Sequence, residues 1–264
     1  MTEPTSSVFL RPGKLVLLVI AGLIVYLCAL AWLIPAGWLW QQLSGQVRLP
    51  PQVEIQQVSG SLWDGAAGLR VHNRDLSVDW ALGWPSLTEL RLPVALSLQT
   101  AASRLDGDLS LAWPGEAALL ATGRIHVPEF EDLIRQSNGA LLEGDVMIDH
   151  LQLRWADNRL ADARGNGHWP GGNVTWPVGD RMQSARFPAM SADLAQSSGG
   201  VTLAISEQGQ QAPAAEADIL RDGMLEVRVY KRLIDLAGQP WSGSASPGDV
   251  VFRVRQPLLP GGRF

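Results

Sequence analysis

The residue types that carry most enzyme chemistry are sparse and scattered in this chain. Its four histidines, His72, His126, His150 and His168, do not stand at the spacings of metal ligands, and none pairs with a nearby cysteine. A structural or catalytic metal site needs several such ligands close together. We therefore expect no metal site, and we interpret the histidines as exposed or hydrogen-bonded side chains on strands.

The carboxylates and the short motifs give no catalytic signature either. Glu129, Glu131 and Asp132 fall at the start of a predicted helix, where acidic side chains interact favourably with the helix dipole. The sequence holds no G-x-S-x-G, S-x-x-K or P-loop motif, and the G-x-G at 165–167 has no βαβ context. These observations argue against an enzyme, and they predict no catalytic residue and no cofactor.

Tryptophan is the residue type that is best suited to binding here, and the chain has 11 of them. Those of the long region after the first 60 residues include Trp63, Trp80, Trp84, Trp113, Trp155, Trp169 and Trp176. Trp80, Trp113 and Trp155 alternate in phase with aliphatic neighbours, which favours packing inside a core. The alternative is an open, curved sheet whose apolar face holds a lipid or a strand of a partner.

An uncharged apolar run at residues 15–34 indicates in which cellular compartment these side chains lie. A helix of about 20 such residues spans the hydrocarbon core of a bilayer. Arg11 and Lys14 precede the run and the next charge is Arg48, so the positive-inside rule predicts a cytoplasmic N-terminus. We predict a cytoplasmic tail over residues 1–14, a transmembrane anchor over 15–40, and an exported domain over 41–264.

Two alternatives to a retained anchor exist for this run: a cleaved signal peptide and a buried core helix. Ala29-Leu30-Ala31 has the small-x-small pattern of a signal-peptide cleavage site. However, the run is longer than the roughly 7–15 apolar residues of a signal-peptide core. A buried core helix is disfavoured because the run is apolar on every face and has basic residues at one end only.

Composition limits the class of partner. The chain carries 21 Lys and Arg residues against 26 Asp and Glu residues, with a net charge of −5 and no basic cluster. Nucleic-acid binding is dominated by contacts of basic side chains with phosphates, so this class is excluded. The one cysteine, Cys28, lies within the apolar run, so we expect no disulfide in the exported domain.

The exported domain is predicted to be mainly β, because apolar and polar residues alternate with period 2 in many segments. The segments are 76–82, 92–98, 109–113, 151–155, 201–205 and 225–229. This alternation predicts a curved antiparallel sheet with one wet face. Turn signals are expected at 104–107 and at 171–173, where Gly, Asp and Asn occur.

One segment, Pro128 to Asn138, has a helical pattern instead. It begins with proline and acidic residues, places Phe130, Leu133 and Ile134 on one face, and is followed by Gly139. We predict one short central helix here. A second short helix near residues 231–237 fits the pattern less fully.

The central helix divides the strand-rich region near its middle. A Trp–x–Gly pattern occurs once on each side, at Trp63 and Trp169, and each is followed by a strand and another tryptophan. The domain is thus either one sheet bent along its length or two related β units, at about 48–127 and 139–256. Two occurrences do not establish a repeat.

Several of these sequence features together resemble those of a known protein family. A short basic tail, one N-terminal anchor, V-x-G-S-L-W-D-G at 58–65 and V-D-W-x-L at 78–82 resemble the type II secretion system protein N family. The matching positions of the family's motif are Gly60, Ser61, Leu62, Trp63, Gly65, Trp80 and Leu82. Independently of the family, two glycines so close together allow a tight turn or bulge, with Trp63 capping the core where the sheet bends.

The resemblance implies an accessory, non-enzymatic component of the type II secretion machinery, which moves folded proteins out of the periplasm. It would lie in the bacterial inner membrane with most of the chain in the periplasm, where the β domain is a scaffold for other secretion components. The alternative from a different class is a membrane-anchored periplasmic lipid-binding or lipid-transfer protein. A lipid groove needs an apolar face that is open to solvent, whereas a scaffold has that face closed by packing.

Overall fold

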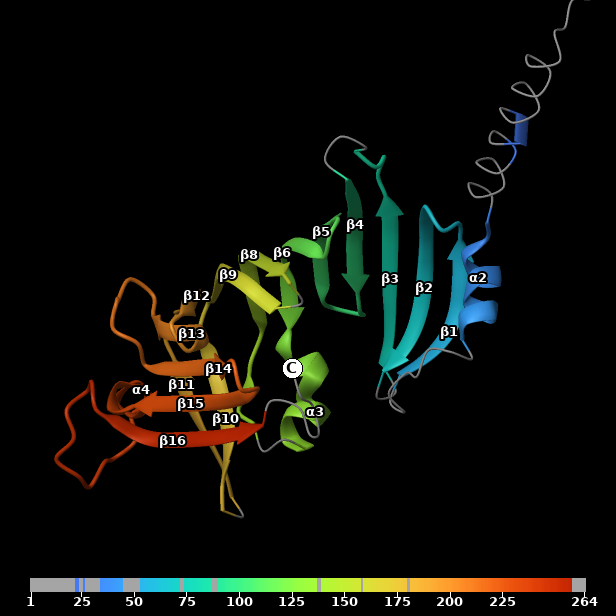
Figure 1. The fold of residues 1–264 in the computed structure, drawn as a ribbon. Helices are drawn as coiled ribbons and strands as arrows, with labels where there is room; N and C mark the ends of the chain where they lie inside the picture. The colour runs from blue at the N-terminus through green and yellow to red at the C-terminus, as the bar shows by residue number, and fades with distance from the viewer. Residues whose placement is uncertain are drawn as a thin grey trace, which may run out of the picture.

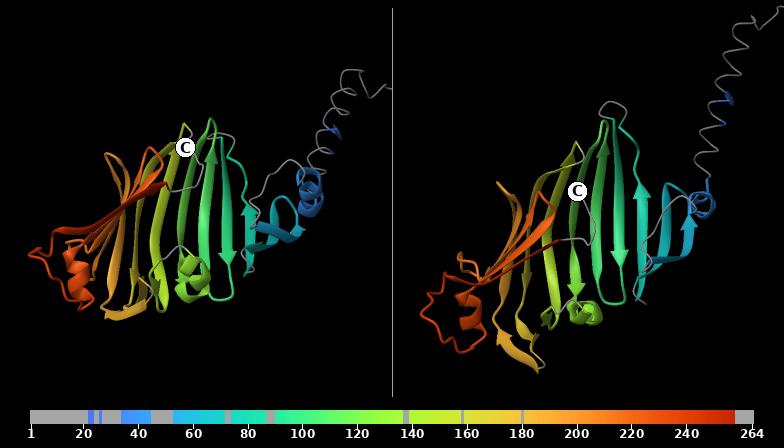
Figure 2. Two further views of the ribbon diagram at one scale, coloured as in Figure 1. Left: turned by 90° about the horizontal axis from the view of Figure 1, so that it is seen from below. Right: turned by 60° about the horizontal axis from the view of Figure 1, so that its bottom comes forward.

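The structure, a computed structural model, describes one very large antiparallel sheet with a small sheet and short helices around it (Figures 1 and 2). The residues described are 34–44, 53–71, 74–86, 90–136, 139–157, 159–179 and 181–257, together with Gly22, Leu23 and Tyr26. Most of the predicted anchor over residues 15–40 therefore lies outside them, and its last five residues, 36–40, belong to a short helix. Within the described part of the chain, no helix is long and apolar enough to cross a membrane.

Thirteen strands form the large sheet, and neighbouring strands in it are antiparallel. In sheet order they are β1 (Val53–Gly60), β2 (Asp64–Val71), β3 (Arg74–Leu82), β4 (Arg91–Gln99), β5 (Arg104–Ala112), β6 (Glu116–His126), β8 (Asp145–Ala156), β9 (Arg159–Trp169), β12 (Met190–Ser197), β13 (Gly200–Glu207), β14 (Ala215–Leu220), β15 (Met224–Tyr230) and β16 (Val250–Pro257). The twist between strands accumulates along this order, so that β14–β16 run almost across the direction of β3 and β4 (Figure 1).

The remaining elements lie at the margins of this sheet. They are a three-stranded sheet of β7 (Leu141–Leu142), β10 (Gly172–Val178) and β11 (Arg181–Phe187), and the helices α2 (Ala36–Leu43), η1 (Val127–Phe130), α3 (Glu131–Gln136) and α4 (Lys231–Leu236). Because β6 pairs directly with β8, the strands on either side of α3 belong to one continuous sheet. The ranges 48–127 and 139–256 are thus joined across their boundary by hydrogen-bonded strands.

The strand register gathers the apolar side chains on one face, which we call the apolar face. Residues directly opposite each other in an antiparallel ladder point to the same side of the sheet. The apolar face carries Val53, Ile55, Val58, Ala67, Leu69, Val71, Leu76, Val78, Trp80, Leu82, Leu92, Val94, Leu96, Leu98, Leu105, Leu109, Leu111, Ala117, Leu119, Ala121, Leu151, Leu153, Trp155, Leu160, Ala163, Trp169, Met190, Ala192, Leu194, Val201, Leu203, Ile205, Ala215, Ala217, Ile219, Leu225, Val227, Val229, Phe252 and Val254.

This apolar face is closed by packing at one end only. There Trp169 and Met190 form a core with Val174 and Phe187 of the small sheet and with Ala214, and α4 packs against it. Trp176 meets Phe187 edge to face, with ring centroids 6.3 Å apart. Elsewhere on the face, Val94, Ala163 and Val201 are buried, and the other side chains are half-buried or exposed. The sheet therefore has a short closed core and a long open stretch.

The elements agree with much of the sequence pattern. Period 2 correctly placed strands in all six predicted segments, and the predicted central helix is present as η1 and α3. The domain has more than that one helix, because α2 and α4 also form. Pro35 has an extended backbone, with ψ of 132°, immediately before α2, so residues 36–43 form a separate helix that lies against β1.

The turn predicted at residues 104–107 is wrong, because β5 already begins at Arg104. Asp106 and Gly107 do not break the strand, since Asp106 accepts hydrogen bonds from Ser97 and Arg104, and Gly107 pairs with Leu96. The actual turn is at 100–103. There the amide of Ser103 donates to the hydroxyl of Thr100 at 3.0 Å, and the amide of Thr100 donates to the carbonyl of Ser103 at 3.0 Å.

Glu129 fastens the central helix to this β4–β5 turn. Its carboxylate accepts hydrogen bonds from the hydroxyls of Thr100 and Ser103, both at 2.6 Å, and from the amide of Ala102 at 2.9 Å. The hydroxyl of Ser103, which is 5% exposed, accepts in turn from the amide of His126. Partial burial alone raises the pKa of Glu129, but the hydrogen bonds from Ser103, Thr100 and Ala102 outweigh it and lower the pKa.

We expect Glu129→Gln to lower the free energy of unfolding of the full chain by about 1–3 kcal/mol at neutral pH, because it removes hydrogen bonds to a charged group. A lowered pKa contributes stability that is complete above the ordinary glutamate pKa and is lost as pH falls through the lowered value. The difference between wild type and variant should therefore shrink on acidification. Urea unfolding followed by tryptophan fluorescence, in detergent, measures both effects.

Glu131→Gln is the matched control. Glu131 forms an exposed ion pair with Arg135 one helical turn away, at 2.5 Å, which is worth less than about 0.5 kcal/mol. Equal effects of the two substitutions, or a Glu129→Gln effect that does not change with pH, would contradict the role assigned to Glu129.

Candidate interaction surface

The motif residues of the sequence lie together at one corner of the sheet, where β1 turns into β2. Gly60 pairs with Gly65 across this turn and has a φ of +83°. A Cβ on Gly60 would lie 2.4 Å from the carbonyl oxygen of Asp64, so no other residue fits there without a shift of the backbone. Gly65 pairs on its other side with Trp80, whose indole covers it: a Cβ on Gly65 would lie 2.5 Å from that ring.

Hydrogen bonds from the other motif residues fix the corner. The Ser61 hydroxyl accepts from the amides of Trp63 and Asp64, at 3.2 and 3.1 Å. The carbonyl of Leu62 accepts from the Trp80 indole at 3.1 Å, and the carbonyl of Trp63 accepts from the amide of Leu82 at 2.6 Å.

The same corner also holds the segment that precedes α2. The amide of Leu62 donates to the carbonyl of Ile34 at 3.2 Å, and Pro35 forms an isolated bridge with Ser61. Ile34 is the last residue of the uncharged apolar run, which lies within the predicted anchor. The motif therefore joins three parts of the chain: the end of that segment, the β1–β2 turn and β3.

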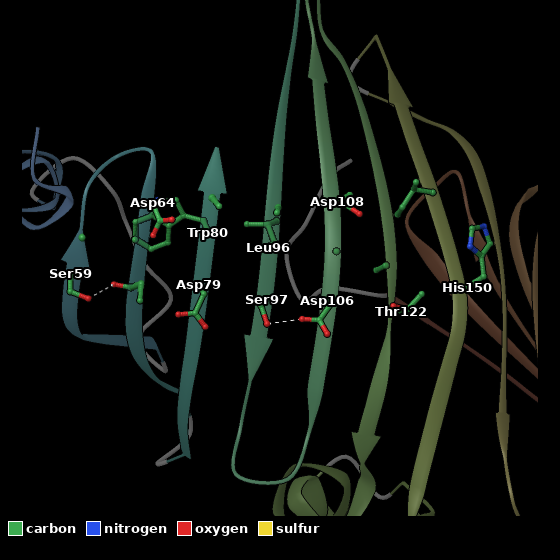
Figure 3. Close-up of a pocket in the computed structure, with 18 residues that line it drawn as sticks. Ser59, Asp64, Asp79, Trp80, Leu96, Ser97, Asp106, Asp108, Thr122 and His150 are labelled. Atoms are coloured by element: carbon green, nitrogen blue, oxygen red, sulfur yellow. Dashed lines mark hydrogen bonds between the residues drawn. The ribbon is translucent and has the colours of Figure 1, made fainter. Parts of the chain in front are cut away.

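A shallow hollow of about 750 Å³ lies on the polar face of the sheet, over strands β1–β8 (Figure 3). Asp64, Asp79, Asp106 and Asp108 face it, and Ser97 hydrogen-bonds Asp106 at 2.8 Å. Hydrogen bonds from Arg104 and Ser97 lower the pKa of Asp106, so this carboxylate remains charged at neutral pH. The hollow therefore carries acidic side chains, which the apolar face on the other side of the sheet lacks along these strands.

The histidines do not gather into a site. His126 contacts Asp145 through Nδ1 at 2.6 Å and His168 contacts Asp149 at 2.9 Å, while exposed His150 lines the edge of the hollow. His72 lies outside the described residues. Within the described ranges, no group of three His, Cys, Asp or Glu side chains can hold a metal ion. Glu131 and Asp132 form ion pairs with Arg135 and Arg74, at 2.5 and 3.3 Å.

The tryptophans divide between the two interpretations made from the sequence. Trp169 and Trp176 pack in the closed core, and Trp80 is half-buried over Gly65. Trp84 and Trp113 are 81% and 76% exposed. Trp113 follows the alternation of β5 but lies just past its last residue, in the turn to β6, which is why the phase argument does not bury it.

The last strand of the sheet, β16, is a surface that the sequence analysis missed. It pairs only with β15 among the described strands, and Val250, Phe252 and Val254 are 40%, 54% and 54% exposed. These residues alternate with Arg253 and Arg255, so period 2 could have identified the strand. At the opposite edge, β1 lies against α2, where a Cβ on Gly37 would stand 3.1 Å from the carbonyl of Val58.

A polar cluster stiffens the strands that support β16. Arg228 of β15 forms ion pairs with Glu216, at 3.0 Å, and with Asp218 of β14. Tyr230 donates to Glu216 at 2.6 Å, and burial together with this hydrogen bond raises the pKa of Tyr230. Thr202 of β13 donates to Asp218. Three neighbouring strands are thereby joined through side chains as well as through their backbones.

The fold and these surfaces define an antiparallel β protein whose open face and outer edge strand are suited to contacts with other molecules. The model of the family "type II secretion system (T2SS), protein N" matches residues 51–231, which is more than half of the chain. The chain belongs to the type II secretion system protein N family, a family of secretion components that is not typically enzymatic. No curated protein and no solved structure matches the chain significantly.

We expect Gly65→Ala to lower the free energy of unfolding by about 1–3 kcal/mol, because its methyl group would overlap the Trp80 ring and the carbonyl oxygens of Ser59 and Ser61. Gly68→Ala in the same strand is the matched control, since its Cβ would meet only the carbonyl of Gln57, at 4.0 Å. That control should change stability by less than about 0.5 kcal/mol. Urea denaturation of both variants checks this, and equal stabilities would show that the Trp80–Gly65 contact does not hold the corner.

Proposed function

We propose that this chain is an accessory inner-membrane component of the type II secretion machinery, with its N-terminus in the cytoplasm and residues 15–34 as its anchor. Its β domain is a non-enzymatic periplasmic scaffold that contacts other components of the machinery. The family match supports the machinery. The uncharged run and its basic flank in the sequence support the topology.

One structural observation carries the scaffold role: the outer strand β16 is left without a neighbour on one side among the described strands. Such an edge presents a row of backbone donors and acceptors that a strand of another protein can extend. Arg253 and Arg255 of β16 form ion pairs with Glu226, at 3.5 Å, and with Asp222, at 2.8 Å. These ion pairs hold the edge in register with β15, so the strand is preformed for pairing.

Proline at the edge tests this role. In an antiparallel strand, alternate amides point toward and away from the neighbouring strand. Of Arg253→Pro and Val254→Pro, one removes a hydrogen bond to β15 and the other removes only an outward amide. We expect the proline variant that removes only an outward-pointing amide to stay folded and to lose nearly all cross-linking to other secretion components in cells. Arg253→Ala and Val254→Ala control for the lost side chains, and a folded proline variant with wild-type cross-linking would overturn the proposal.

A second candidate, binding of a lipid on the apolar face, is favoured by the openness of that face. Across β1–β8 Val94 is its one buried side chain, at 9% exposure, while neighbours such as Leu96 and Leu98 are half-buried. An apolar surface that continues over neighbouring strands without a cover is a binding surface rather than a core. A scaffold domain is expected to have its apolar face covered by packing. In this structure the face is covered only near Trp169.

Photocross-linking in cells separates this candidate from the scaffold. A benzophenone side chain at position 98 would lie on the apolar face, and one at the neighbouring position 97 on the polar face. If lipid occupies the face, mass spectrometry should find lipid adducts at position 98 and none at 97. Protein adducts at 98, or adducts equally frequent at both positions, would exclude the lipid candidate.

A further inference from the structure

Exposed apolar side chains gather at one end of strands β1–β9. Trp84 and Leu90 lie in the β3–β4 connection, Leu111 and Trp113 lie at the end of β5, and Leu160 lies near the start of β9. Their exposed fractions are 81%, 57%, 41%, 76% and 39%, in that order. The amide of Trp113 donates to the carbonyl of Leu90 at 3.1 Å, so the two turns are in contact. We call these five residues the aromatic rim.

The aromatic rim lies at the end of the sheet where the chain arrives from its predicted anchor. Because β2 begins where β3 ends, the β1–β2 turn and the β3–β4 connection share one end of the sheet (Figure 1). Ile34 is hydrogen-bonded to the first of these turns through Leu62. Trp38, in the first turn of α2, is 53% exposed and adds another aromatic side chain near this end.

The opposite end of the same strands is polar. There Glu129 binds the β4–β5 turn, and Arg74 forms an ion pair with Asp132. Among the described residues from β1 to β9, Leu120, in the middle of β6, is the one large exposed apolar side chain away from the aromatic rim. One end of the sheet thus exposes apolar and aromatic side chains and the other end exposes polar ones, as expected for a domain with one end at a membrane surface.

The side chains themselves indicate the kind of partner. An indole has an apolar body and one polar N–H group, which suits the boundary between lipid and water. Among the described residues, exposed charges of both signs lie near the aromatic rim: Arg91 and Arg159, and Asp64, Glu116 and Asp157. Insertion of aromatic rings, rather than attraction to anionic lipid, is therefore the interaction that this end of the sheet can make.

We propose that the aromatic rim rests on the surface of the bilayer in which the chain is anchored, so that the strands stand upright on the membrane. This inference rests on the anchor in the proposed function. It is independent of whether β16 binds a secretion component. The occupant is a lipid surface because the aromatic rim shares one end of the sheet with the β1–β2 turn, to which Ile34, the last residue of the uncharged run, is hydrogen-bonded through Leu62.

Spin labels on the full chain, reconstituted in phosphatidylethanolamine–phosphatidylglycerol vesicles, test the proposal. In a Cys28→Ser background, Glu116→Cys places a label beside Trp113 while the aromatic rim remains intact. Ala101→Cys places the control label in the exposed β4–β5 turn at the opposite end. We expect the label at 116 to be several-fold less accessible than that at 101 to a water-soluble nickel complex, and more accessible to oxygen.

The double substitution Trp84→Ser and Trp113→Ser should raise the nickel accessibility at 116 to that at 101. Since both side chains are more than three-quarters exposed, the variant is expected to stay folded, and unchanged urea denaturation checks this. Equal accessibility at 116 and 101 in the parent chain would overturn the proposal. Protection at 116 that requires other secretion components would also overturn it, because a protein would then cover the aromatic rim.

A label on the native Cys28 distinguishes this failure from failure of the anchor. A label at 28 that lies within lipid, together with an exposed label at 116, rejects the aromatic rim and leaves the anchor standing. A label at 28 that is exposed to water rejects both.

Discussion

One constraint governs this structure. In an antiparallel sheet whose apolar and polar side chains alternate, one whole face is apolar, and that face is either covered by packing or left open to other molecules. The cross-strand pairs of thirteen strands put leucine, valine and alanine on a single face. Only near Trp169, where the small sheet and α4 pack, does a second layer close that face. A domain of this size usually builds a core from two packed layers. Here most of the sheet is a single layer, and its surfaces are available to other molecules.

A single layer needs local devices to keep its shape, and the structure shows three. The glycine corner of Gly60 and Gly65 brings the Trp80 indole onto the β1–β2 turn. The carboxylate of Glu129 ties the central helix to the β4–β5 turn. Arg228 and its carboxylate partners join β13–β15, the strands next to the outer strand β16 in the same sheet. Each device sits where strands turn or where the sheet ends, since those are the places that packing leaves unsupported.

Sequence patterns predicted the local structure well, because period 2 and helix signals act within a few residues. They identified strands in six segments and the short central helix. They failed where a long-range contact decides: Asp106 and Gly107 look like a turn but pair within β5, and Trp113 keeps the phase of a strand that has already ended. The number of layers depends on contacts between segments that are far apart in the chain. The sequence patterns therefore allowed both alternatives, one bent sheet and two related β units.

The central claim is that β16 is the edge at which the protein joins the secretion machinery. Hydrogen–deuterium exchange on the full chain in native membranes, with and without the other machinery components, tests it most directly. If β16 is that edge, the amides of residues 250–256 exchange more slowly when the components are present, while the amides of the β4–β5 turn are unchanged. Exchange at residues 250–256 that is the same in both membranes would contradict it.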